Sequence, residues 1–173
     1  MPVLEKKVVT SELREQVKHS IIISEKPLLG SAETETPGGA KSSEGRPYYI
    51  YSTRPELFDD IGPTPKYLGY VAIQEGTTKD IKEKEGIALA EKHNVKETDM
   101  VADMNDFYPL ESIGTKFDEM GVGGRVLDLI LKKLSDDFDW VICFSTRPKM
   151  VRLLESRGFQ PNEDGDGWIK KLE

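Results

Sequence analysis

A glycine-rich segment that leads into an amphipathic helix constrains this chain more than any other feature. Gly121, Gly123 and Gly124 fall within four positions, and the apolar residues after them recur at helical spacing. A glycine segment at a helix N-terminus exposes backbone N–H groups beside the positive end of the helix dipole. The segment therefore predicts a phosphate site. The alternative interpretation is a tight turn with close packing, for which glycine is equally suited.

The composition predicts one globular domain with an acidic surface. The chain has 173 residues, of which 37% are hydrophobic and 32% charged, and its formal net charge is −7. An acidic surface argues against general nucleic-acid binding, which needs a basic one. One cysteine excludes an internal disulfide, and we find neither a signal peptide nor an apolar run of membrane-spanning length. We expect a soluble cytoplasmic protein.

The first half of the chain predicts short elements around a long polar loop. Residues 30–47 contain no large apolar side chain, so we expect a flexible loop there, within a single domain of residues 1–173. Residues 78–93 predict a polar helix that forms a possible insertion. The other expected elements are an opening strand within residues 1–9, a helix over 10–19, an undecided segment at 21–23, and strands over 48–53 and 67–74.

The second half predicts alternating strands and helices. The unbroken apolar run 140–144 suits a strand buried on both faces, while Pro148 begins and Gly158 ends the next helix. The other expected elements are a strand over 110–115, the long helix after the glycines, and closing strands at 159 and 168–172. This order indicates an α/β fold with a mixed central sheet flanked by helices.

The same order, with two local motifs, resembles the C-terminal half of GNAT-type N-acetyltransferases. Their acetyl-CoA loop has the pattern Arg/Gln-x-x-Gly-x-Gly/Ala, and the matching stretch is 118–123, followed by Gly124. Their second helix typically closes with Tyr-x-x-x-Gly-Phe, which residues 154–159 match except at the tyrosine. The resemblance is strongest over residues 107–173 and implies a single GNAT-like domain.

The resemblance implies an acetyl-CoA-dependent N-acetyltransferase that acts on an amine, with acetyl-CoA as co-substrate. In the family, a splayed strand pairs with pantetheine, which implies that role for Ile113 and Thr115. A carboxylate, often through water, removes the amine proton; Glu111 is our candidate base, and Asp103 and Asp106 are further candidates. Backbone amides of the loop hold the CoA pyrophosphate. The residues matching that loop are Met120, Gly121, Val122, Gly123, Gly124 and Arg125.

Three departures from the family pattern favour an alternative, a catalytically inactive GNAT-fold binding or structural protein. Asp118 occupies the Arg/Gln position of the loop, and a carboxylate that faces a pyrophosphate repels it. Leu154 replaces the tyrosine that often protonates the departing thiolate, and Arg147 replaces a frequent asparagine. A third reading, an acidic mimic of nucleic acid, is disfavoured because 24 Lys and Arg residues intersperse the acidic ones.

The remaining reactive residues suggest structural roles. Cys143 lies in an apolar run, where the pKa of a thiol rises and core packing is the simpler interpretation. Residues 162–173 match the spacing of a calcium loop, but an Asp-Gly hairpin turn explains them too, and we expect no metal site. The expected partner is a small-molecule or protein amine, attracted by the acidic charge, with neither nucleic acid nor membrane. The oligomeric state stays open.

Overall fold

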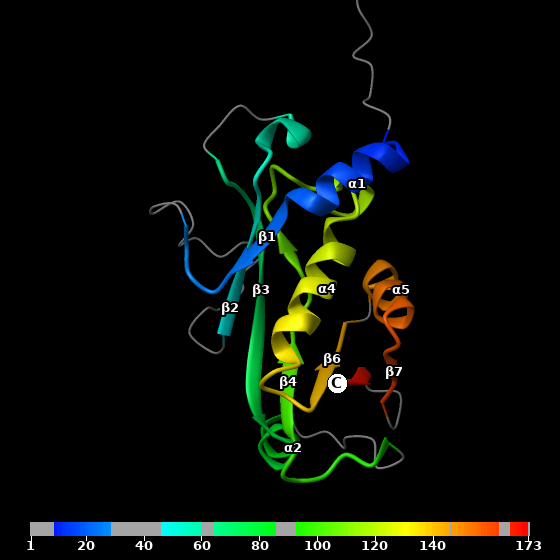
Figure 1. Ribbon diagram of the computed structural model, residues 1–173. Coiled ribbons are helices and arrows are strands. Elements are labelled where there is room, and N and C mark those ends of the chain that lie inside the picture. The colour runs from blue at the N-terminus through cyan, green and yellow to red at the C-terminus, as the bar shows by residue number, and fades with distance from the viewer. Residues whose placement is uncertain are drawn as a thin grey trace, which may run out of the picture.

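The computed structural model of the protein shows a mixed sheet with helices packed against it (Figure 1). It describes residues 9–28, 46–59, 64–85, 93–145, 147–162 and 167–172. Seven strands in these ranges follow one another across the sheet in the order β1 (Ile21–Ser24), β2 (Arg46–Ser52), β3 (Lys66–Thr77), β4 (Met100–Met104), β6 (Trp140–Cys143), β8 (Trp168–Lys171) and β7 (Gln160–Pro161). A short strand, β5 (Tyr108–Pro109), pairs with β3.

The sheet is antiparallel except at its centre. β4 and β6 run parallel, with Val101 opposite Trp140 and Met104 opposite Cys143. β6 is buried along its whole length, as its apolar sequence predicts, although its other neighbour, β8, is antiparallel. After Met104 the chain no longer pairs with β6, and the strand that follows β4 in the sequence, β5, pairs with β3. The pairing of the two central strands therefore ends at Met104 and Cys143.

Three helices cover one face of the sheet: α1 (Ser11–Ser20), α4 (Val122–Leu134) and α5 (Pro148–Ser156) (Figure 1). The apolar stripe of α4 forms the centre of the core, because Val126, Leu127, Ile130 and Leu134 are fully buried. The shorter helices are α2 (Thr78–Glu85), α3 (Lys116–Glu119) and the 3₁₀ helix η4 (Pro55–Phe58). No helix in the described ranges has the length and apolarity needed to cross a membrane.

Aromatic side chains fill part of the opposite face. Tyr49 on β2 lies opposite Tyr70 on β3, and their ring centroids are 5.5 Å apart. Because side chains alternate along a strand, Gln74 shares this face with Tyr70. Gln74 lies opposite Asp103 of β4 in the register, so both polar side chains lie on the face away from α4.

Several expected elements are confirmed. The helix expected over 10–19 is α1, and the N–H of Leu13 donates to Thr10 Oγ1 over 3.0 Å, so Thr10 caps it. The undecided segment 21–23 is strand β1, and the expected strands at 48–53 and 67–74 are β2 and β3. The helix after Pro148 is α5, and Gly158 follows it with a left-handed φ of 85°. The strand expected at 168–172 is β8.

Other expectations need correction. The strand expected over 110–115 is a turn, because Gly114 has a φ of 51° and both Ile113 and Gly114 donate to the carbonyl of Leu110. The strand at the centre of the sheet is β4 instead. Arg46 and Pro47 belong to β2 and not to the polar loop. Other expectations lie partly outside the described residues. These are the opening strand (1–8), most of the polar loop (29–45), the end of the 78–93 helix (86–92) and much of the calcium-like stretch (163–166 and 173).

Candidate functional site

The N-terminus of α4 is built by one left-handed glycine. Gly121 precedes the helix with a φ of 74°, and a Cβ added there meets nothing within 4 Å. Glycine is therefore favoured by the backbone conformation and not by crowding. Gly123 and Gly124 lie inside the first turn of α4, not in a loop before it. The first backbone N–H groups of this helix have no intrahelical acceptor and are available to an anion.

Close packing explains the two helical glycines. A Cβ on Gly124 would lie 2.9 Å from Arg157 Nη2, and a Cβ on Gly123 would lie 3.2 Å from Leu153 Cδ1. Both contacts are with α5 or the residue that ends it. Gly123 and Gly124 thus let α5 approach α4 closely, while Gly121 shapes the helix N-terminus.

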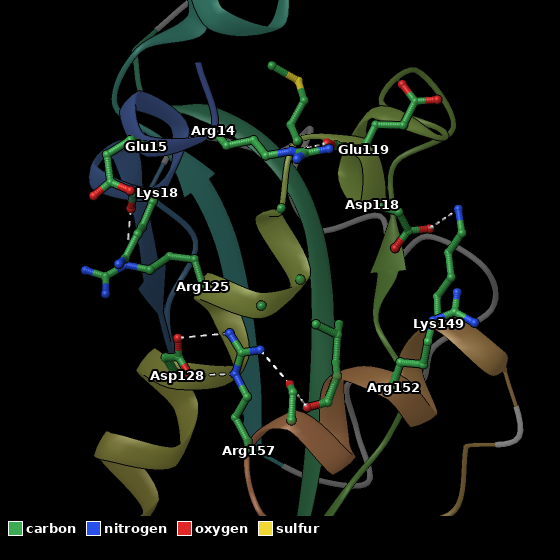
Figure 2. A pocket seen from close by; sticks show the side chains of 16 residues that line it. Arg14, Glu15, Lys18, Asp118, Glu119, Arg125, Asp128, Lys149, Arg152 and Arg157 are labelled. Atoms are coloured by element: carbon green, nitrogen blue, oxygen red, sulfur yellow. Dashed lines mark hydrogen bonds and ion pairs between the residues drawn. The ribbon is translucent and has the colours of Figure 1, made fainter. Parts of the chain in front are cut away.

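A cavity of about 660 Å³ opens at the N-terminus of α4, between α1 and α5 (Figure 2). Its basic residues come from α1, from α4 and from α5 and its end; they are Arg14, Lys18, Arg125, Lys149, Arg152 and Arg157. Its acidic residues are Glu15, Asp118, Glu119 and Asp128. Basic side chains outnumber acidic ones here although the chain has a net charge of −7. We call this the basic cavity; its charge suits an anion.

Two of its carboxylates are neutralised by neighbouring cations. Arg157 donates from Nε and Nη2 to the two carboxylate oxygens of Asp128, over 3.0 and 3.2 Å. Figure 2 shows Asp118 turned toward Lys149, whose Nζ is 3.7 Å from Asp118 Oδ2. Arg147 Nη1 lies 3.9 Å from the same oxygen. These contacts reduce the repulsion that Asp118 would exert on a bound phosphate.

A second cavity, of about 370 Å³, lies where β4 and β6 separate. Its lining residues are Gln74, Asp103, Met104, Asn105, Asp106, Tyr108, Phe144 and Ser145. Asp103 is 5% exposed, and Gln74 Oε1 is buried without a hydrogen-bond partner among the described residues. None of the described lining residues is basic. We call this the acidic cavity; its carboxylates and carbonyl oxygens suit a cation or a hydrogen-bond donor.

Arg147 joins the ends of the two central strands at this cavity. Its Nε donates to Asp106 Oδ2 over 2.6 Å and its Nη2 to Oδ1 over 2.9 Å. Ser145 Oγ donates to the same Oδ2 over 2.9 Å. The hydrogen bond to Asp106 raises the pKa of Arg147, so the guanidinium stays charged. Arg147, which stands where the family frequently has asparagine, therefore bridges the ends of β4 and β6.

The residues expected on the splayed strand do not lie on a strand. Glu111 is exposed in the turn and lines neither cavity. Ile113 is buried in the core, and Thr115 is exposed at the N-terminus of α3. Of the expected carboxylates, Asp103 and Asp106 come together in the acidic cavity. The structure therefore separates Glu111 from both cavities.

The residues expected to hold pyrophosphate do come together. Met120, Gly121, Gly123, Gly124 and Arg125 line the basic cavity, whereas Val122 is buried in the core. The sequence reasoning missed the contributions of α1 and α5. A signal was present, because basic residues recur one turn apart on each helix. These pairs are Arg14 with Lys18, and Lys149 with Arg152.

Cys143 belongs to the core, as its sequence context indicated. Burial raises its pKa to about 12, and the side chain is fully buried in β6. Within the described ranges, no group of three or more His, Cys, Asp or Glu residues could hold a metal ion.

Comparison with known proteins identifies relatives by structure alone. No family model and no curated protein sequence matches this chain. Among solved structures, a tyrosine-to-phenylalanine variant of KacT matches with a TM-score of 0.51 and 10% identity, over 88% of this chain and 95% of that one. NAA60 from Arabidopsis thaliana, in complex with a bisubstrate analogue, matches with a TM-score of 0.50 and 10% identity, over 89% of this chain and 100% of that one. These proteins are GNAT acetyltransferases, and the chain has their fold.

A weaker match concerns nucleic acid. AtaT complexed with acetyl-methionyl-tRNAfMet matches with a TM-score of 0.44 and 11% identity, over 75% of this chain and 72% of that one. The expectation that nucleic acid is not a partner stays a prediction from the net charge.

Proposed function

Because the chain has the GNAT fold, we propose that it is an acetyl-CoA-dependent N-acetyltransferase acting on an amine. One observation carries the proposal. A net-positive cavity lies at the N-terminus of α4, and an acidic cavity lies where β4 and β6 separate. Arg147 connects the two, because it pairs with Asp106 of the acidic cavity and lies 3.9 Å from Asp118 of the basic cavity. The basic cavity suits the phosphates of acetyl-CoA, and the acidic cavity suits a cationic acceptor.

The N-terminus of α4 would bind the pyrophosphate. The left-handed Gly121 leaves the first N–H groups of the helix without backbone acceptors, and they lie at the edge of the basic cavity. Lys149 and Arg152 on α5 add positive charge from the other wall. From there the pantetheine arm would reach the point where β4 and β6 cease to pair.

Asp103 would act as the general base in place of Glu111. Its carboxylate is buried on the face of the sheet away from α4 and lines the acidic cavity. The amine nitrogen would attack the thioester carbonyl carbon, a C–N bond would form, and the C–S bond would break. Asp103 would take the proton that the amine loses, directly or through water, and the CoA thiolate would take up a proton on leaving.

Tyr108 would supply the proton to the thiolate. The family's usual tyrosine position is Leu154 here, which is fully buried in the core and carries no proton to give. Tyr108 lines the acidic cavity together with Asp103 and Asp106. A phenol can donate a proton, and Tyr108 supplies one in the cavity where the reaction would take place.

The second candidate function is a GNAT-fold binding protein without catalysis, which the burial of Leu154 favours. Two measurements separate the candidates. Calorimetry with acetyl-CoA tests the basic cavity, and release of free CoA thiol across a panel of amines and peptides tests catalysis. Release of CoA that depends on the acceptor supports the enzyme. Binding of acetyl-CoA without release for any acceptor favours the binding protein, and the absence of binding at millimolar acetyl-CoA contradicts the enzyme.

A further inference from the structure

Two arginines of the basic cavity are each anchored to a neighbouring element through Nε. Arg14 of α1 donates from Nε to the backbone carbonyl of Glu119, at the end of α3, over 3.2 Å. Arg125 of α4 donates from Nε to the carbonyl of Lys18, near the end of α1, over 3.1 Å (Figure 2). In the described part of the chain, neither arginine has an ion pair, and the Nη atoms of both have no hydrogen-bond acceptor. Each guanidinium is thus held in place with its outer donors available.

Lys18 adds a third positive charge to this side of the cavity. It lies one helical turn after Arg14, so both side chains leave α1 on one face. Like charges at this spacing repel one another, and no carboxylate among the described residues pairs with either. Figure 2 shows the carboxylate of Glu119 turned away from the Arg14 guanidinium.

The other acidic residues of the basic cavity have partners elsewhere. Glu15 Oε1 lies 3.1 Å from His19 Nε2, and Asp128 is paired with Arg157. The three cations on the α1 side are therefore not neutralised by the described chain. A cluster of unpaired cations in a protein of net charge −7 marks a place where an external anion is bound favourably.

We propose that Arg14, Lys18 and Arg125 form a second phosphate subsite, distinct from the N-terminus of α4, which binds a phosphomonoester group of the ligand. This inference rests on the proposed function, because coenzyme A carries a pyrophosphate and, separately, a 3′-phosphate on its ribose. The pyrophosphate would lie at α4 and the 3′-phosphate between α1 and Arg125. Arginine donors suit a phosphate dianion because the planar guanidinium can give two parallel hydrogen bonds.

The anchoring through Nε makes the subsite selective. A guanidinium that is already oriented loses less side-chain freedom when the phosphate arrives. We therefore expect the protein to bind CoA roughly ten- to a hundredfold more tightly than dephospho-CoA, the range that one charge-assisted contact can give. Lys149 and Arg152, on the α5 side, would lie beside the pyrophosphate and not the 3′-phosphate, so they would not contribute to this ratio.

Calorimetric dissociation constants of CoA and dephospho-CoA test the subsite, in the wild type and in Arg14→Ala, Lys18→Ala and Arg152→Ala. Of the two α1 variants, Lys18→Ala should disturb the fold less. The hydrogen bond from Arg125 goes to the backbone carbonyl of residue 18, which alanine also has. We expect the ratio of the two constants to fall toward one in Arg14→Ala and Lys18→Ala, with dephospho-CoA affinity unchanged. Arg152→Ala, a basic residue of the same cavity, is the matched control and should keep the wild-type ratio.

The outcomes distinguish this inference from the proposed function. Equal affinity of the wild type for CoA and dephospho-CoA overturns the subsite and leaves the proposed function standing. The same holds if Arg152→Ala, and not the α1 variants, abolishes the preference. A preference that depends on Arg14 and Lys18, in a protein that transfers no acetyl group, supports the subsite and contradicts the enzyme. Failure of both ligands to bind at millimolar concentration overturns both proposals.

Discussion

Arg147 and Asp106 form a two-contact ion pair that bridges the ends of β4 and β6, with distances of 2.6 and 2.9 Å. Asp106 lines the acidic cavity, whereas Asp118, 3.9 Å from the same guanidinium, lines the basic cavity. One side chain thus touches a residue of each cavity at the point where the two strands separate. The pair neutralises Asp106; Asp103, which is buried and lines the same cavity, is the candidate base.

Replacing Arg147 by alanine should lower the free energy of unfolding by about 1 kcal/mol, because it leaves Asp106 without its charged donor. The figure lies below the usual range for charged hydrogen bonds because the Arg147 side chain is 43% exposed, so solvent screens the pair. Thermal denaturation measures the change. Arg54→Ala is the matched control, as it removes an arginine from a more exposed pair with Glu56 and should change stability less. Equal losses in both variants would contradict the bridge.

Asp103→Asn should slow acetyl transfer by roughly a hundredfold or more, because the amide cannot accept the amine proton. Its dissociation constant for acetyl-CoA should be unchanged, since Asp103 does not line the basic cavity. Steady-state kinetics and calorimetry on the same samples check both expectations. Asp136→Asn, at an exposed position after α4, is the control. Full activity in Asp103→Asn would remove this residue as the base.

Gly121→Ala should destabilise the protein by about 1 kcal/mol, because an alanine side chain disfavours the left-handed conformation before α4. No steric term adds to this, as nothing lies within 4 Å of the new Cβ. Gly121→Asn should lose less, since asparagine tolerates that conformation better. Urea denaturation compares the two variants. An alanine variant as stable as the wild type would show that α4 does not begin through a left-handed residue.

Thr10→Ala should lower the free energy of unfolding by about 1 kcal/mol, because it removes the acceptor for the N–H of Leu13 at the start of α1. Thr10→Ser keeps that acceptor and should retain most of the stability. Chemical denaturation of the three proteins gives the comparison. If serine and alanine destabilise the chain equally, the cap does not stabilise α1.

Cys143 should not react with a thiol reagent in the native protein at pH 8. Burial raises its pKa to about 12, so the group is a neutral thiol there, and only the thiolate is the nucleophile. Because the unfolded thiol ionises near pH 8.5, its contribution to stability is lost as the pH rises from there toward 12. Labelling with and without guanidinium tests this, with reaction expected only after unfolding. Rapid labelling of the native protein would contradict the burial of β6.

Local sequence patterns determined the helices α1, α4 and α5 and the strands β2, β3 and β6. A cap at Thr10, a proline at 148 and the apolar periodicity of α4 act within a few residues, so they can be read without the fold. The order of these elements, together with the glycine segment and the Gly-Phe ending of 154–159, indicated the GNAT fold, which structural comparison then showed. The glycine segment likewise predicted the place of the helix N-terminus to within a turn.

Only the tertiary structure decided which residues share a site. The segment 110–115 has β-forming residues, but Gly114 and two hydrogen bonds to Leu110 turn it, and β4 takes the central place in the sheet. The basic cavity joins Arg14 and Arg152, which are distant in sequence, because α1 and α5 flank the same helix N-terminus. Local spacing specifies helices and turns, since these depend on near neighbours. The packing of helices against the sheet brings distant charges together, and no local pattern encodes that arrangement.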